Sequence, residues 1–131
     1  MELFMAFATD NGKDFNDDHF GMARYYHIYR FRDDKEEFVE QRENVEFQED
    51  ESKKHGDPAK AQATSSVLGG VDVLVSKKFG PNITRMVDKF VCVIVRTNVI
   101  SDAITIVKDH MEEVIAEKNK TKDRRHLVFK Q

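Results

Sequence analysis

The stretch LFMAFAT, residues 3–9, is apolar up to its last residue and ends at the turn-forming sequence DNGK. A run that is apolar at odd and even positions alike is typical of a strand covered on both faces of a sheet. The runs VDVLVS at 71–76 and FVCVIV at 90–95 have largely the same pattern. Together the three segments predict a mostly parallel sheet with helices packed against it.

The region between the first two apolar runs has a different pattern. ARYYHIYRFR at 23–32 and EEFVEQRENVEF at 36–47 mix apolar and charged residues, and RDDKE lies between them. This mixture predicts an antiparallel hairpin. Its second strand is expected to form a charged edge of the sheet that discourages aggregation.

Three segments are predicted to be helical. The first helix begins at Asp57, has Pro58 at its first position and ends before Gly69. The second begins at Pro81, and the third begins after Ser101 and runs to residue 118. Right-handed crossovers then place the two later strands on one side of the first strand and the hairpin on the other. The predicted fold class is α/β, a ribonuclease H-like five-stranded mixed sheet of order 3-2-1-4-5 with three helices.

Length and charge indicate one globular domain, which we expect over residues 1–118, followed by a basic C-terminal tail over 119–131. Residues 33–57 contain eleven acidic and four basic residues, whereas residues 118–131 contain six basic and one acidic. We interpret these segments as a solvated edge and a solvated tail. The tail is short and its basic residues are not interleaved with aromatic ones, which argues against a nucleic-acid partner.

The sequence favours a cytoplasmic protein without a membrane partner. No apolar run approaches the ~20 residues that a membrane-spanning helix needs, and the first residues do not resemble a signal peptide. The single cysteine, Cys92, excludes an internal disulfide and a four-thiolate iron–sulfur site built from one chain. Because Cys92 lies early in its strand, we expect it to be a small core residue.

Candidate site residues follow the ends of the first and fourth strands. Ligands of open α/β sheets bind beyond the carboxyl ends of the parallel strands. Asp10 ends the first strand, and the loop containing His19 follows it. The predicted helix start at Gly80, Pro81 and Asn82 follows the fourth strand. Unpaired amides at a helix start attract anions, so these residues predict one cleft with affinity for an anion.

Two lysines and a second histidine extend this candidate cleft. Lys77 and Lys78 directly precede the predicted helix start and would strengthen its attraction for an anion. His55 lies in HGD at 55–57, and the long loop at 48–56 could bring it across to the same end of the sheet.

Six short motifs, ATDNG, HFGMARYYHIY, EN at 43–44, HGD, VDVLV and GPN at 80–82, occur in the order and approximate spacing of a known family. Over residues 3–115 the chain resembles the nitrogenase iron–molybdenum cofactor biosynthesis family, which includes NifX-like carriers, NafY-like accessory proteins and the C-terminal domain of NifB-like proteins. The resemblance implies a non-catalytic protein that binds or carries an iron–sulfur-type metallocluster. It also implies a partner protein that donates or accepts the cluster.

The resemblance makes His19 in HFG the best candidate metal ligand and His55 in HGD the second. A neutral imidazole nitrogen can bind iron, and few ligands suit a carrier that must release its cargo. The alternative for His19 is a turn residue without a ligand, and we interpret His27, His110 and His126 as structural. The predicted cofactor-binding residues are His19, His55, Asp10, Gly80, Pro81, Asn82, Lys77 and Lys78, and no catalytic residue is predicted.

The sequence KKF before GPN departs from the family, whose members tend to have small residues there. Phe79 would narrow the site, which favours a second hypothesis: a cluster-free module that binds or regulates a protein through the acidic segment 33–51. A third hypothesis is a metal-dependent nuclease, which needs two or more converging acids. The first strand has no internal acid, and Asp72 opens its strand at the wrong end.

Overall fold

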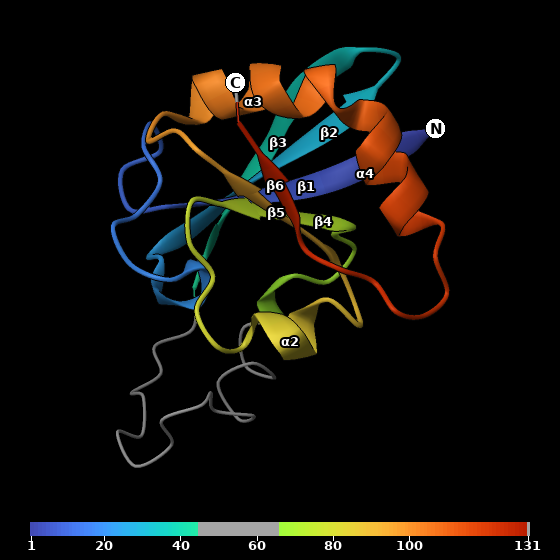
Figure 1. Cartoon of the computed structure of the whole chain (residues 1–131). Helices are drawn as coiled ribbons and strands as arrows, with labels where there is room; N and C mark the ends of the chain where they lie inside the picture. Colours follow the sequence, from blue (N-terminus) through green and yellow to red (C-terminus); the bar gives the residue numbers. More distant parts are fainter. Residues whose placement is uncertain (45–65, 131) are drawn as a thin grey trace.

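The computed structural model describes residues 1–44 and 66–130, and its strands form one six-stranded sheet of order β3-β2-β1-β4-β5-β6 (Figure 1). The strands are β1 (Glu2–Thr9), β2 (Tyr25–Arg32), β3 (Lys35–Glu43), β4 (Val73–Ser76), β5 (Val91–Val95) and β6 (Leu127–Phe129). The helical elements of these residues are the 3₁₀ turn η1 (Phe20–Met22), α2 (Ile83–Met86), α3 (Ile100–Asp109) and α4 (Met111–Lys118).

The predicted fold class and strand order are confirmed. β1 pairs parallel with β4, β4 with β5, and β5 with β6, whereas β2 and β3 are antiparallel. β1 lies inside the sheet because its side chains are apolar on both faces. Met5 and Phe7 enter one core, and Ala6 and Ala8 enter the other. The molecule is a ribonuclease H-like α/β domain with one sheet between two helical layers.

Different helices cover the two faces of the sheet. α3 and α4 lie across one face of the sheet, and α2 lies on the opposite face (Figure 1). Val107 of α3 and Val114 of α4 are fully buried in the first core. Phe20 of η1 and Met86 of α2 are buried in the second. The loop that contains His19 therefore packs on the α2 face.

The β2–β3 hairpin turns as the sequence predicts. Asp33 and Asp34 have positive φ angles of 52° and 63°, the left-handed conformation that two-residue hairpin turns require. β3 is the sheet edge, and all but one of its residues are exposed, so the predicted charged edge is confirmed. The pairing with β2 shifts register between Ile28 and Tyr29, and such an irregularity further protects an edge strand.

The C-terminal segment contributes a sixth strand that the sequence analysis did not predict. We expected residues 119–131 to be a basic tail, but β6 extends the sheet beside β5. Phe129 is 2% exposed and its ring stacks on that of His110 with 4.3 Å between centroids. The Arg96 amide donates to the Phe129 carbonyl. One buried aromatic residue thus attaches a three-residue strand that is too short to show a periodic pattern.

The predicted helices also need correction. The helix expected after Ser101 is two helices, because the backbone of His110 (φ −115°, ψ 23°) interrupts it between α3 and α4. The helix expected from Pro81 is the single turn α2. Most of the helix expected from Asp57 lies outside the described residues, but Gly70 just after its predicted end has a φ of +81°. None of the described helices is long and apolar enough to cross a membrane.

Candidate functional site

His19 lies at the start of η1, in the connection that follows β1. The buried Asn16 side-chain amide donates to the carbonyls of Asp18 (3.1 Å) and His19 (3.0 Å), which fixes the loop from within. The Phe20 amide donates to the Lys78 carbonyl at 2.8 Å. The loop of His19 is therefore hydrogen-bonded to the segment that follows β4, as the predicted cleft requires.

The imidazole of His19 lies directly against Gly80. Gly80 has a φ of +78°, and a Cβ atom there would lie 2.3 Å from Nδ1 and 2.6 Å from Cγ of His19. The His19 side chain is 35% exposed, and its Nδ1 is 3.9 Å from the Asp18 carboxylate. Two of the predicted residues are thus in contact, and the imidazole remains accessible to a ligand.

Phe79 does not occupy the site that the sequence analysis expected it to narrow. It is 5% exposed, and its ring stacks on that of Phe20 with 5.1 Å between centroids and an angle of 13°. Phe20 also stacks on Tyr26, whose hydroxyl donates to the Phe20 carbonyl at 3.0 Å. Phe79 is a core residue that holds the His19 loop in place.

Asp10 and Asn44 hold the far end of the same loop. The Asp10 carboxylate accepts a hydrogen bond from the Arg24 amide at 2.9 Å. The Asn44 side-chain amide donates to the carbonyls of Gly21 (3.0 Å) and Ala23 (2.7 Å). The motif residues Asp10 and Asn44 therefore position the backbone around His19, and Asp10 uses its carboxylate for that contact.

A groove of about 580 Å³ opens at the carboxyl ends of β4 and β5. The Lys77 ammonium lies 3.1 Å from both the Asp17 carboxylate and the Asn98 side-chain oxygen. The side chains of Lys78 and Arg96 make no hydrogen bond or ion pair with any residue in 1–44 or 66–130. The groove therefore has an excess of positive charge. Its lining residues are Asp17, Lys77, Lys78, Val95, Arg96, Thr97 and Asn98.

The groove also contains Arg96, Thr97 and Asn98, which are not among the predicted site residues. These residues directly follow β5, as Asp10 follows β1 and Lys77 follows β4. The rule that placed Asp10 and Lys77 at the ligand-binding end of the sheet applies equally to them. The signal is present in the sequence, because RTN directly follows an apolar run that is predicted to be a parallel strand.

The predicted helix start contributes less than expected. Pro81 is exposed in a turn, and Asn82 precedes a helix of four residues. The Ile83 amide already donates to the Gly80 carbonyl, and the Asn82 side-chain oxygen accepts from Arg85. Because the helix dipole grows with aligned peptide units, a single turn attracts an anion only weakly. Attraction at this end must come from side-chain charges.

His55 lies outside the described residues. Among the described ones, no group of three or more His, Cys, Asp or Glu side chains is arranged to hold a metal ion. Cys92 is fully buried, as expected, and its burial raises the pKa of the thiol to about 12, although the charge of Arg124 acts in the opposite direction. A thiol of this pKa is a poor metal ligand because the thiolate is the binding form.

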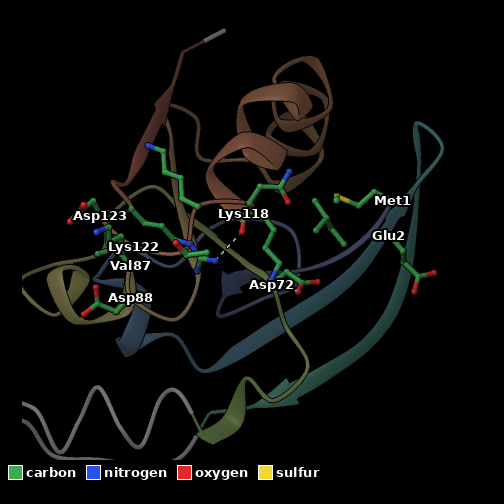
Figure 2. Close-up of a pocket in the computed structure, with 13 residues that line it drawn as sticks. Met1, Glu2, Asp72, Val87, Asp88, Lys118, Lys122 and Asp123 are labelled. Atoms are coloured by element: carbon green, nitrogen blue, oxygen red, sulfur yellow. Dashed lines mark hydrogen bonds and ion pairs between the residues drawn. The ribbon is translucent and has the colours of Figure 1, made fainter.

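A larger cavity, of about 840 Å³, lies at the opposite, amino end of the parallel strands (Figure 2). One ion pair joins two of its charged side chains. Figure 2 shows Lys118 reaching Asp72, with 3.4 Å between the Lys118 ammonium and the carboxylate. The other Asp72 oxygen accepts from the Phe4 amide. These contacts connect α4 to the central strands, so we assign this end a structural role.

Comparison with known proteins identifies the family. Residues 1–117 match the family model described as dinitrogenase iron–molybdenum cofactor. Among solved structures, the fold is similar to that of a candidate dinitrogenase from Methanocaldococcus jannaschii, with a TM-score of 0.56 and 14% identity over 84% of this chain and 91% of the other. No curated protein matches the chain. The structural likeness shows the fold alone, but the family match spans most of the sequence, and the chain therefore belongs to the dinitrogenase iron–molybdenum cofactor family.

Proposed function

We propose that this protein is a non-catalytic cytoplasmic accessory protein that carries an iron–sulfur-type metallocluster, such as the iron–molybdenum cofactor or a precursor. The cluster is cargo, received from a donor protein and passed to an acceptor. The observation that carries the proposal is the partly exposed imidazole of His19, held in position by Gly80 and by the hydrogen bonds of its loop. Family membership supports the same class of cargo.

The chemistry of the site suits a cargo that must be released. His19 offers a nitrogen to iron, and a single imidazole binds less permanently than a closed set of several ligands. Lys77 and Lys78 line the groove at the same end of the sheet, where Lys77 is paired with Asp17. Clusters built from iron and sulfide with anionic ligands have a net negative charge, so these cations complement the cargo. His55 is proposed as a second ligand.

The main argument for a cluster-free module was the bulk of Phe79, and that argument no longer applies because the ring is buried against Phe20. The nuclease hypothesis gains no support from the described residues, in which no three acids or histidines converge. Cargo binding therefore remains the function that the geometry favours.

The proposal is tested by loading under anaerobic conditions. Wild type, His19→Ala and His126→Ala are each treated with iron and sulfide, or with a preassembled synthetic cluster, and bound iron is quantified together with the absorption spectrum. His126 is an exposed histidine and serves as the matched control. We expect iron in wild type and His126→Ala and its loss in His19→Ala, with the free energy of unfolding changed by less than ~1 kcal/mol.

Equal iron in all three proteins would show that His19 is not a ligand. Iron in none of them, from either source, would contradict the carrier function itself.

A further inference from the structure

We infer that Lys78, Arg96 and Lys130 form a row of cations across the carboxyl ends of β4, β5 and β6, and that this row binds the anionic part of a multiply charged ligand beside His19. The inference rests on the proposed function only for the identity of that ligand. The site itself follows from strand register, from the groove and from the charges that the described residues leave unpaired.

Strand register places the three cations side by side. Ser76 of β4 pairs with Ile94 of β5, so Lys78 and Arg96 each lie two residues beyond the same pair. Val95 pairs with Phe129 of β6, which places Arg96 and Lys130 one residue beyond that pair. Neighbouring strands are about 4.8 Å apart, so the row offers three positive charges within roughly 10 Å at the backbone.

Two further observations support the proximity of the three cations. Lys78 and Arg96 line the same groove of about 580 Å³. The Arg96 amide donates to the Phe129 carbonyl at 3.0 Å, so the β5–β6 ladder continues to the level of the row. Lys130, the next residue, is exposed.

The charges of the row are available to a ligand. No hydrogen bond or ion pair joins the side chains of Lys78, Arg96 or Lys130 to other residues in 1–44 or 66–130. The acid that lines the groove, Asp17, lies beside Lys77 instead. An array of unpaired cations at one end of a sheet stabilises a ligand with two or more negative groups better than a singly charged one.

The third cation lies outside the part of the chain that matches the family. The family match ends at residue 117, whereas β6 and Lys130 lie beyond it. The C-terminal strand therefore has a role besides closing the edge of β5. It carries one more positive charge to the end of the sheet where His19 lies, and it determines which anions this chain retains.

Pyrophosphate is a suitable probe because it has several negative charges, contains no metal and needs no histidine ligand. We would titrate it into wild type, Lys78→Gln, Arg96→Gln and Lys130→Gln at low salt and measure the dissociation constant by calorimetry. Lys89→Gln is the matched control, since Lys89 is an exposed lysine that precedes β5 at the other end of the sheet.

We expect each of the three row substitutions to weaken binding by about 5-fold, as for loss of one exposed ion pair of ~1 kcal/mol, and salt to weaken wild-type binding. Lys89→Gln should bind as wild type does. If Lys89→Gln weakened binding equally, the effect would be one of net charge alone, and the inference would be overturned. Absence of measurable pyrophosphate binding to wild type would also overturn it. Unchanged binding in Lys130→Gln would remove the C-terminal strand from the site.

The two proposals fail separately. Pyrophosphate binding is measured without iron, so a failure of His19 to bind iron leaves the result of the titration readable. The row variants could in turn lose pyrophosphate binding and still bind iron through His19. That result would show that the cation row and His19 bind their ligands independently.

Discussion

At the scale of single residues, Gly80 and His19 form the contact on which the candidate site depends. Both residues were predicted from their motifs, but their contact was not. The sequence has no periodic pattern that indicates a positive φ angle. Nor does it indicate a tertiary contact between an imidazole and a glycine. Arg96 could have been predicted, because it directly follows β5 at the carboxyl end of the parallel strands, beside the end of β4.

Gly80→Ala tests the contact directly. The new Cβ would displace the His19 ring, which can rotate into solvent, and the left-handed backbone would cost an alanine about 1 kcal/mol. Gly70→Ala is the matched control, because Gly70 has a φ of +81° but nothing within 4 Å of its Cβ position. We expect both variants to lose about 1 kcal/mol of stability in urea unfolding and only Gly80→Ala to lose bound iron. Full iron loading of Gly80→Ala would show that the position of His19 is unimportant.

At the scale of elements, the buried strands could be predicted and the short peripheral ones could not. β1, β4 and β5 are apolar on both faces, a pattern that few other structures produce. β6 has only three residues within a basic segment, so its tertiary contacts, and not its local sequence, determine its conformation. The break at His110 is likewise invisible locally, because the apolar spacing continues across it from α3 to α4.

Phe129→Ala tests how β6 is attached. Loss of the buried ring and of its stacking on His110 should lower the free energy of unfolding by about 3 kcal/mol. The Arg96 amide, which donates to the Phe129 carbonyl, should exchange its hydrogen faster. Val128→Ala is the control, since Val128 is 41% exposed and its loss should cost under ~0.5 kcal/mol. Unchanged exchange at Arg96 would mean that β6 stays paired without its aromatic anchor.

At the scale of the whole molecule, the two ends of the sheet have different roles. The strand order was predictable because right-handed crossovers leave few arrangements for these strands. It also predicts that a ligand binds at the carboxyl end, where Lys78 and Arg96 have no partners among the described residues. At the amino end two ion pairs involve α4: Lys118 with Asp72, and the buried Glu117 with Lys120. Paired charges stabilise the fold, and unpaired charges remain available for a ligand.

Glu117→Gln tests this division. Burial alone would raise the pKa of Glu117, but the hydrogen bonds from Lys120 and the Arg125 amide, with the charges of Lys120 and Arg124, lower it overall. A carboxyl group whose folded pKa lies below its unfolded value of about 4.5 stabilises the protein above that pH. This contribution is lost as the pH falls through the folded pKa.

We therefore expect Glu117→Gln to lose about 2 kcal/mol in urea unfolding at neutral pH and to approach wild type in acid, while iron loading at His19 is unchanged. Glu112→Gln, an exposed change in the same helix, should behave as wild type throughout. A stability difference that persists undiminished in acid would show that the charge of Glu117 is not what holds the C-terminal segment. A fall in iron loading would show that the two ends of the sheet are coupled, because the substitution lies at the end opposite His19.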